Sequence, residues 1–245
     1  AAFQSGPGIG SGVEEIPGRI PRSEPAFGGR ARCRRRTIGG GLSRRHLLGS
    51  VAAGGLVLLG GGARATSLIA TPSEGPGPFY PQDIPLDHDA DLVQVAGRAR
   101  KAAGDIVQLF GRVLDPVGKP LSGVKIEIWQ CDAKGIYHHP GDWRGSADPN
   151  FQGYGTAIAV ADGGYRFRTI KPVPYSGRTP HIHAMVSGAG MRRFTTQIYL
   201  KGHPQNADDF LFKGLGNARL QDASSVDFTR QRNGEAAGRF DIVIG

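Results

Sequence analysis

The residues of this chain whose types and spacing could support chemistry gather around a His-X-His pair. His181 and His183 flank Ile182 in an apolar stretch, and positions i and i+2 of a β-strand project to the same face. Two imidazoles placed in this way can bind one metal ion, although such a pair also occurs as two ordinary surface side chains. The setting favours a metal, because Tyr175 lies in a loop just upstream and Tyr137 follows another apolar stretch.

The combination of two phenols and two imidazoles indicates which metal would bind. A phenol has a pKa of about 10, so only a strong Lewis acid coordinates it at neutral pH. Zn(II) is normally bound by Cys, His and carboxylate groups, whereas a small, triply charged ferric ion favours anionic oxygen. The sequence therefore predicts a non-haem Fe(III) site with four protein ligands: Tyr137, Tyr175, His181 and His183.

Other histidines and tyrosines compete for the same role. His138 and His139 adjoin Tyr137, but adjacent side chains of an extended segment diverge, so we interpret both as loop residues. Three further tyrosines are expected to be half-buried rings that cap loops: Tyr80, Tyr154 and Tyr199.

Short β-strands must position these side chains. Alternating apolar and polar residues predict strands at 106–114, 124–129, 156–160, 165–170, 181–186, 194–200 and 240–244. The Ala-Asp-Gly-Gly stretch at 161–164 is expected to join two of them as a hairpin, and 201–239 to be mostly loop. No stretch shows a sustained helical stripe. Residues 66–245 are therefore predicted to form one all-β domain, an antiparallel β-sandwich of about seven to nine strands with long connecting loops.

The positive charge of the chain is concentrated at its beginning. The formal net charge is +9, and residues 1–65 hold ten Arg, no Lys and three acidic residues, which together contribute +7. Residues 66–245 therefore carry only about +2, and we expect no nucleic-acid partner.

Residues 1–65 are expected to be a leader that contains a signal peptide. Arg44 and Arg45 precede the apolar run 51–59, and an Ala-Arg-Ala stretch at 63–65 has the small residues that a signal peptidase reads. The arginine pair resembles a twin-arginine signal, and the run is too short to cross a membrane. We expect an exported protein, periplasmic or extracellular, with no stable membrane span. The alternative is a basic tail followed by a Gly- and Ala-rich linker.

Several ordered motifs together resemble the intradiol ring-cleavage dioxygenases, of which protocatechuate 3,4-dioxygenase is the type. The likeness runs from about residue 71 to residue 213. The matching stretches are Ile128-Trp129-Gln130 with Gly135-Ile136-Tyr137, Asp148-Pro149-Asn150-Phe151, Gly164-Tyr165-Arg166-Phe167-Arg168 leading to Pro174-Tyr175, Arg178-Thr179-Pro180-His181-Ile182-His183, and Thr196-Gln197-Ile198-Tyr199.

The resemblance implies a β-sandwich enzyme that cleaves a catechol-type aromatic between its two hydroxyl-bearing carbons, with O2 and non-haem Fe(III), to a cis,cis-muconate-type diacid. It implies Tyr137 and His181 as equatorial ligands and Tyr175 and His183 as axial ligands. Tyr175 would be displaced by the catechol and accept one of its protons.

The resemblance also assigns roles to two residues that do not bind the metal. Arg178 matches an arginine beside the substrate, where a fixed guanidinium would stabilise negative charge on the ring. Gln197 matches a glutamine near the site, where we expect it to donate a hydrogen bond to the groups around the metal. The chain departs from the protocatechuate enzymes between Tyr175 and Arg178, where only Ser176 and Gly177 intervene. We expect this short link to open the site to bulkier or variously substituted catechols.

Two other classes of protein fit part of the sequence. Residues 115–124 also resemble the turn of prealbumin-like repeats, so a non-enzymatic β-sandwich binding module is the alternative function. A hydrolase with zinc on the two histidines would need a general base, and the sequence places no carboxylate obviously near them. A homo-oligomer is compatible with the sequence, which does not define the number of copies.

Overall fold

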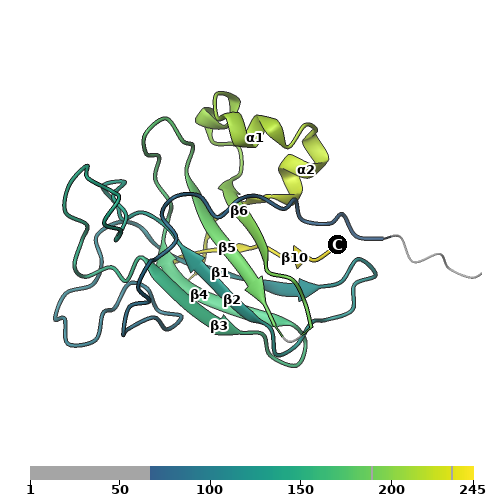
Figure 1. Ribbon diagram of the computed structural model, residues 1–245, viewed down its shortest axis with the longest axis horizontal. Helices are drawn as coiled ribbons and strands as arrows, with labels where there is room; N and C mark the ends of the chain where they lie inside the picture. The colour runs from purple at the N-terminus through teal and green to yellow at the C-terminus, as the bar shows by residue number, and fades with distance from the viewer. Residues whose placement is uncertain (1–66, 189, 233) are drawn as a thin grey trace, which may run out of the picture. The chain divides into compact units, whose positions relative to one another are not determined.

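The computed structural model describes residues 67–188, 190–232 and 234–245 (Figure 1). The leader prediction for residues 1–65 lies outside this range. Ten strands are present in the described part: β1 Ile106–Leu114, β2 Lys125–Trp129, β3 Tyr154–Ile158, β4 Gly164–Ile170, β5 His181–Ser187, β6 Phe194–Leu200, β7 Ser225–Val226, β8 Thr229–Arg230, β9 Ala236–Arg239 and β10 Ile242–Val243. Three short helices lie between β6 and β7: the 3-10 helix η1 Pro204–Ala207, α1 Phe210–Gly214 and α2 Ala218–Ala223.

The first sheet is built around β1. Antiparallel β4 pairs with it along nearly its whole length, and β9 and β10 pair with it in parallel, β10 beyond the end of β9. The link from β9 to β10 passes directly over Gly111. A Cβ atom at that position would lie 1.8 Å from the carbonyl oxygen of Phe240, so only glycine permits this approach.

The second sheet carries the residues singled out for chemistry. Its strand order is β3-β2-β5-β6-β7, with antiparallel pairs except for the parallel pair of β6 and β7. The register places His183 of β5 between two neighbours, Trp129 of β2 and Gln197 of β6. The two short α-helices lie together beyond one end of β6 (Figure 1).

The main core lies between the inner faces of the two sheets. Ile126 and Ile128 of β2, Ile182 of β5 and Ile198 of β6 are fully buried, in one cluster with Phe167 of β4. Burial of each isoleucine contributes roughly 1.5–3 kcal/mol. Because side chains alternate along a strand, the odd-numbered residues of β5 point to the opposite face. Loops cover that outer face and enclose a second cluster: Trp129, Cys131, Tyr137, Tyr154, Tyr175 and Met185.

The all-β sandwich is confirmed, and β1 and β6 have the bounds expected from their alternation. The hairpin expected at residues 161–164 is wrong. A tight turn is present, in which Val160 N–H donates to the Gly164 carbonyl, but β3 joins the second sheet and β4 the first. The turn is therefore a crossover between the two layers.

Residues 201–239 were expected to be mostly loop, and this expectation is also wrong in part. They contain three short helices and three short strands, each of two to six residues. Asp209 and Asn217 cap the two α-helices, each accepting two backbone N–H groups. No helix within the described residues is both long and apolar enough to cross a bilayer.

Candidate metal centre

The four side chains predicted as ligands meet on the outer face of the second sheet. His181 and His183 lie on β5, Tyr175 lies in the loop between β4 and β5, and Tyr137 lies in the loop after β2. All four are buried, with exposed fractions of 1% for each histidine, 4% for Tyr137 and 9% for Tyr175. The Tyr137 and Tyr175 rings meet edge to face, with their centroids 5.1 Å apart.

The two imidazoles direct their Nε2 atoms to one point. His181 Nδ1 lies 2.7 Å from the Thr179 carbonyl oxygen, to which it donates, so its Nε2 is left as an acceptor. That Nε2 lies 3.2 Å from His183 Nε2 and 3.5 Å from the Tyr175 hydroxyl. The His183 ring stacks on Trp129 at 4.9 Å and 4°, which fixes its plane. A cation at this point would receive both nitrogens.

The Tyr137 phenol is enclosed without a hydrogen-bond partner. Its hydroxyl makes no such bond to any described residue, although Phe79 stacks on its ring at 4.6 Å. Its backbone N–H donates to Asp142 Oδ2 at 2.8 Å, which holds the ring in place. An unsatisfied buried hydroxyl costs about 1–3 kcal/mol, so a ligand at this oxygen would remove a real penalty.

Burial holds all four donors in their neutral forms. Desolvation, followed by the neighbouring Tyr175 phenol, raises the pKa of Tyr137 well above its usual value. Desolvation also raises the pKa of Tyr175, against the opposing pull of Arg178. Desolvation, followed by the charge of Arg178, lowers the pKa of His181 to about 4. Desolvation is also the main reason why the pKa of His183 lies well below its usual value. Only a strongly charged cation would release protons from these phenols.

The donor set fits Fe(III) better than zinc. Within the described residues no group of three or more His, Cys, Asp or Glu side chains could hold a metal ion. Zinc sites are normally built from such groups, whereas the pocket here offers two phenols and two imidazoles. The two imidazole Nε2 atoms lie 3.2 Å apart beside the Tyr175 hydroxyl, and the neighbouring Tyr137 hydroxyl has no partner among the described residues, which together fit a ferric ion.

Arg178 is held beside this pocket by two partners. Its Nε donates to Asp209 Oδ2 at 2.7 Å, and its NH2 group donates to Gln197 Oε1 at 2.7 Å. The same Asp209 oxygen accepts the backbone N–H of Thr179, whose carbonyl receives the His181 Nδ1 proton. The pKa of Asp209 is lowered because these hydrogen bonds and the Arg178 charge outweigh its burial. Gln197 therefore touches the guanidinium and orients it, and it does so as an acceptor, whereas a donor was expected from the sequence.

Three carboxylates that support the site were missed by the sequence analysis. Asp209 and Asp142 are described above, and Glu74 accepts the Tyr199 hydroxyl at 2.7 Å and the Gln197 backbone N–H at 3.2 Å. Burial raises the pKa of Glu74. The Asp-Phe pair at 209–210 is an N-cap signal that could have been noticed, but no spacing rule links Glu74 to Tyr199, 125 residues away.

The rival residues lie elsewhere, as expected. His138 Nε2 lies 2.9 Å from the Asp148 carbonyl, and His139 Nδ1 accepts the Gly141 N–H. The Tyr80 and Tyr154 hydroxyls both donate to Glu127. Each of these side chains already has a structural partner. The expectation of half-buried rings that cap loops is wrong for Tyr154 and Tyr199, because both lie on strands, β3 and β6, and are 2% and 0% exposed.

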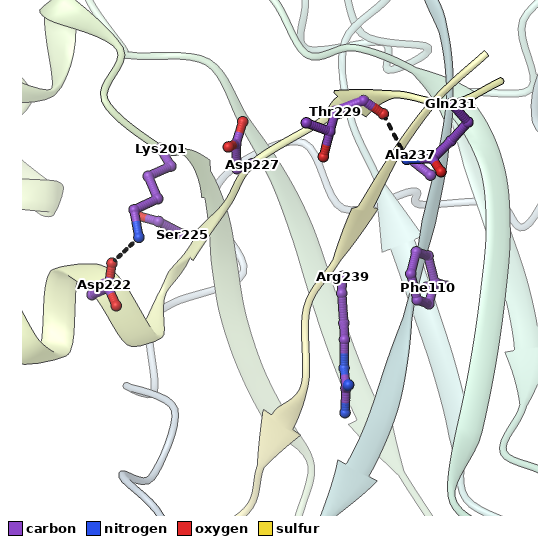
Figure 2. Close-up of a pocket in the computed structure, with 9 residues that line it drawn as sticks. All are labelled: Phe110, Lys201, Asp222, Ser225, Asp227, Thr229, Gln231, Ala237 and Arg239. Atoms are coloured by element: carbon purple, nitrogen blue, oxygen red, sulfur yellow. Dashed lines mark hydrogen bonds and ion pairs between the residues drawn. The ribbon is translucent and has the colours of Figure 1, made fainter. Parts of the chain in front are cut away.

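A separate cavity of about 420 Å³ lies at the edge of the sandwich. It is lined by residues of β1, β7, β8 and β9 and by Lys201 and Asp222, which form an ion pair at 2.5 Å (Figure 2). None of the predicted ligands lines it, so it is distinct from the centre on the outer face of the second sheet.

The comparisons with known proteins identify the family. The family model described as dioxygenase matches residues 75–245. The chain is 39% identical over 173 residues to the protocatechuate 3,4-dioxygenase beta chain of Burkholderia cepacia, which covers 65% of this chain and 72% of that one. The chain therefore belongs to the intradiol ring-cleavage dioxygenases, a family of enzymes.

Other relatives extend this likeness to different substrates and to solved structures. Catechol 1,2-dioxygenase of Pseudomonas sp. (strain EST1001) is 31% identical over 201 residues, which cover 74% of this chain and 61% of the relative. The chain thus spans less than two thirds of that enzyme. The dioxygenase domain of a dioxygenase and carbohydrate-binding protein fusion from Streptomyces sp. SirexAA-E is 31% identical, with a TM-score of 0.57 over 72% of this chain and 98% of that one.

Proposed function

We propose that the chain holds Fe(III) with Tyr137, Tyr175, His181 and His183 and cleaves a catechol-type substrate with O2 to a cis,cis-muconate-type diacid. The observation that carries the proposal is the approach of two imidazole Nε2 atoms to 3.2 Å beside two buried phenols. Membership of the family supports the class of reaction. The alternative of a binding module has no need for this donor set.

The residues of the chain would divide the work at this site. Bound Fe(III) would draw electron density from the catechol ring and make its carbons reactive toward O2. Tyr175 is the more exposed of the two tyrosines, at 9% against 4%, and as the tyrosinate it would accept a catechol proton when the substrate enters. Arg178 would stabilise negative charge on the ring, and Gln197 would keep the guanidinium aimed at it.

Aromatic side chains would exclude water from the reacting ring. Trp129 stacks on His183, and Phe79 stacks on Tyr137 and meets Tyr175 edge to face. This shell makes the interior of the site apolar on one side. Charge developing on the substrate would therefore interact strongly with the nearby guanidinium of Arg178.

Substitution of Tyr175 tests the proposed ligand set. Tyr175→Phe should retain the fold, since the contact of this hydroxyl with His181 Nε2, at 3.5 Å, is a weak hydrogen bond. We expect the iron-loaded variant to lose part of the visible tyrosinate-to-iron absorption and to bind catechol more slowly. Tyr80→Phe is the matched control, because this phenol lies in the same aromatic cluster outside the donor set. Identical spectra for wild type and Tyr175→Phe would reject Tyr175 as a ligand.

The substrate is proposed to be a bulkier or substituted catechol. The link Ser176–Gly177 is short, and one aromatic side chain beside Arg178 is exposed to solvent. The centroid of the Phe210 ring lies 5.6 Å from the Arg178 guanidinium carbon, and Phe210 is 68% exposed. It offers a surface for an additional ring. Activity confined to one small catechol across a panel of substituted catechols would reject this proposal.

The leader is proposed to direct export through a twin-arginine route. The support is the sequence alone: Arg44 and Arg45 ahead of the apolar run 51–59. Fractionation of cells expressing the full chain should place it outside the cytoplasm, and the double variant Arg44→Lys, Arg45→Lys should retain it inside. Equal distribution of the two proteins would reject the signal.

A further inference from the structure

The loop after β2 carries an ion pair between Arg144 and Asp142. Arg144 donates through Nε to Asp142 Oδ1 at 2.7 Å and through an NH2 group to Asp142 Oδ2 at 2.5 Å, a two-pronged contact. The Asp142 side chain is fully buried, and that of Arg144 is 24% exposed. The guanidinium is therefore held in one orientation.

Asp142 contacts the backbone of Tyr137, and Arg144 contacts the ring of Tyr175. Asp142 Oδ2 accepts the backbone N–H of Tyr137 at 2.8 Å. The guanidinium carbon of Arg144 lies 5.0 Å from the centroid of the Tyr175 ring and 5.9 Å from that of Phe79. Such a position over a ring face is attractive and directional. The pair thus connects the two tyrosines from outside the donor set.

Arg144 also reaches the turn that presents Tyr175. Its NH1 group donates to Ser176 Oγ at 3.2 Å. Ser176 has a φ of 42°, in the left-handed region, and the turn is closed by backbone hydrogen bonds between Tyr175 and Arg178. The two-residue link offers only one side chain, that of Ser176, and Arg144 binds it.

We propose that Arg144, fixed by Asp142, is a positioning residue that sets the orientation of the Tyr175 ring relative to Tyr137. The inference rests on the proposed function, in which Tyr175 binds the metal and yields its place to a catechol. Arg144 does not touch the donor atoms. It acts on the face of the ring and on the turn, and it determines how firmly Tyr175 is held before substrate enters.

The test compares Arg144→Met with Arg166→Met in the iron-loaded, full-length protein. Arg166 provides the matched control, because its guanidinium lies 5.2 Å from the Phe110 ring on the first sheet, away from the centre. Arg144→Met should shift the visible absorption band of the resting protein and change the KM for catechol about two- to fivefold, with unchanged iron content. Arg166→Met should change neither.

A second variant covers the case in which Arg144→Met does not fold. Arg144→Lys retains the charge and loses the two-pronged contact, so an intermediate band shift is expected. The proposal is overturned if Arg144→Met, or Arg144→Lys where Arg144→Met does not fold, has the absorption band and the KM of the wild type. A wild-type protein that takes up no iron or shows no band would instead reject the proposed function itself, so the two failures are distinguishable.

Discussion

Asp209 offers the sharpest test of how the site is held, because one carboxylate supports three features at once. Its Oδ2 accepts Arg178 Nε and Thr179 N–H, and its Oδ1 accepts the N–H groups of Leu211 and Phe212 at the start of α1. Asp209→Asn changes the charge and one set of hydrogen bonds while retaining a good helix cap.

The expected cost follows from the burial of the ion pair. The Asp209 side chain is fully buried and that of Arg178 is only 13% exposed. Asp209→Asn leaves the largely buried charge of Arg178 without a counter-charge. It can also place the amide NH2 group of the new side chain against the N–H groups of Arg178 and Thr179, which are donors too. Such a loss costs about 3–5 kcal/mol, and the partial exposure of Arg178 favours the lower end, about 3 kcal/mol. Asp209→Ala should cost about 1 kcal/mol more, since it also removes the cap.

Urea unfolding of the purified variants measures these differences. Asp222→Asn is the control, because it removes the partner of Lys201 from an ion pair whose side chains are 56% and 63% exposed (Figure 2). That control should unfold like wild type, since exposed pairs contribute little. A change below about 0.5 kcal/mol for Asp209→Asn would refute the inference that Arg178 depends on this carboxylate.

Three further predictions concern burial, close packing and pH. Tyr165→Phe removes a buried hydrogen bond of 2.6 Å to the Phe240 carbonyl and should lower the free energy of unfolding by about 1–2 kcal/mol, measured in urea. Gly77→Ala should weaken iron uptake in a metal titration, because its Cβ would lie 3.1 Å from His183 Cε1. Gly97→Ala, with a similar positive φ and nothing within 4 Å, should not. In the metal-free protein, the pKa of His181 is about 4 in the folded state and about 6.5 in the unfolded chain. On acidification below pH about 6.5, His181 is therefore protonated in the unfolded chain before it is protonated in the folded protein. Stability should therefore fall by about 3 kcal/mol between pH 6.5 and 4, and an unchanged unfolding free energy over this range would contradict the assignment.

The strands and the His-X-His pair could be predicted because their signal is local. Alternation in β1 and β6 reflects the two faces of each strand, and the same period places His181 and His183 opposite Ile182, which is buried between the sheets. The convergence of the two tyrosines was predicted from their position beside the strand and from the resemblance. Their role as ligands stays a prediction.

The features that were missed depend on partners far apart in the sequence. Turn residues at 161–164 specify a tight reversal, but which sheet each flanking strand joins is decided by pairing with β1 and β2. Helices α1 and α2 have five and six residues, too few for a helical stripe. Glu74 reaches Tyr199 across 125 positions, a contact that no local pattern encodes.

The visible spectrum of the purified protein after loading with Fe(III) tests the central claim most directly. The account predicts uptake of iron equimolar with the protein and a wine-red colour from tyrosinate-to-iron charge transfer, with a band that changes when catechol is added under anaerobic conditions. A protein that stays colourless after iron reconstitution would contradict the site formed by Tyr137, Tyr175, His181 and His183.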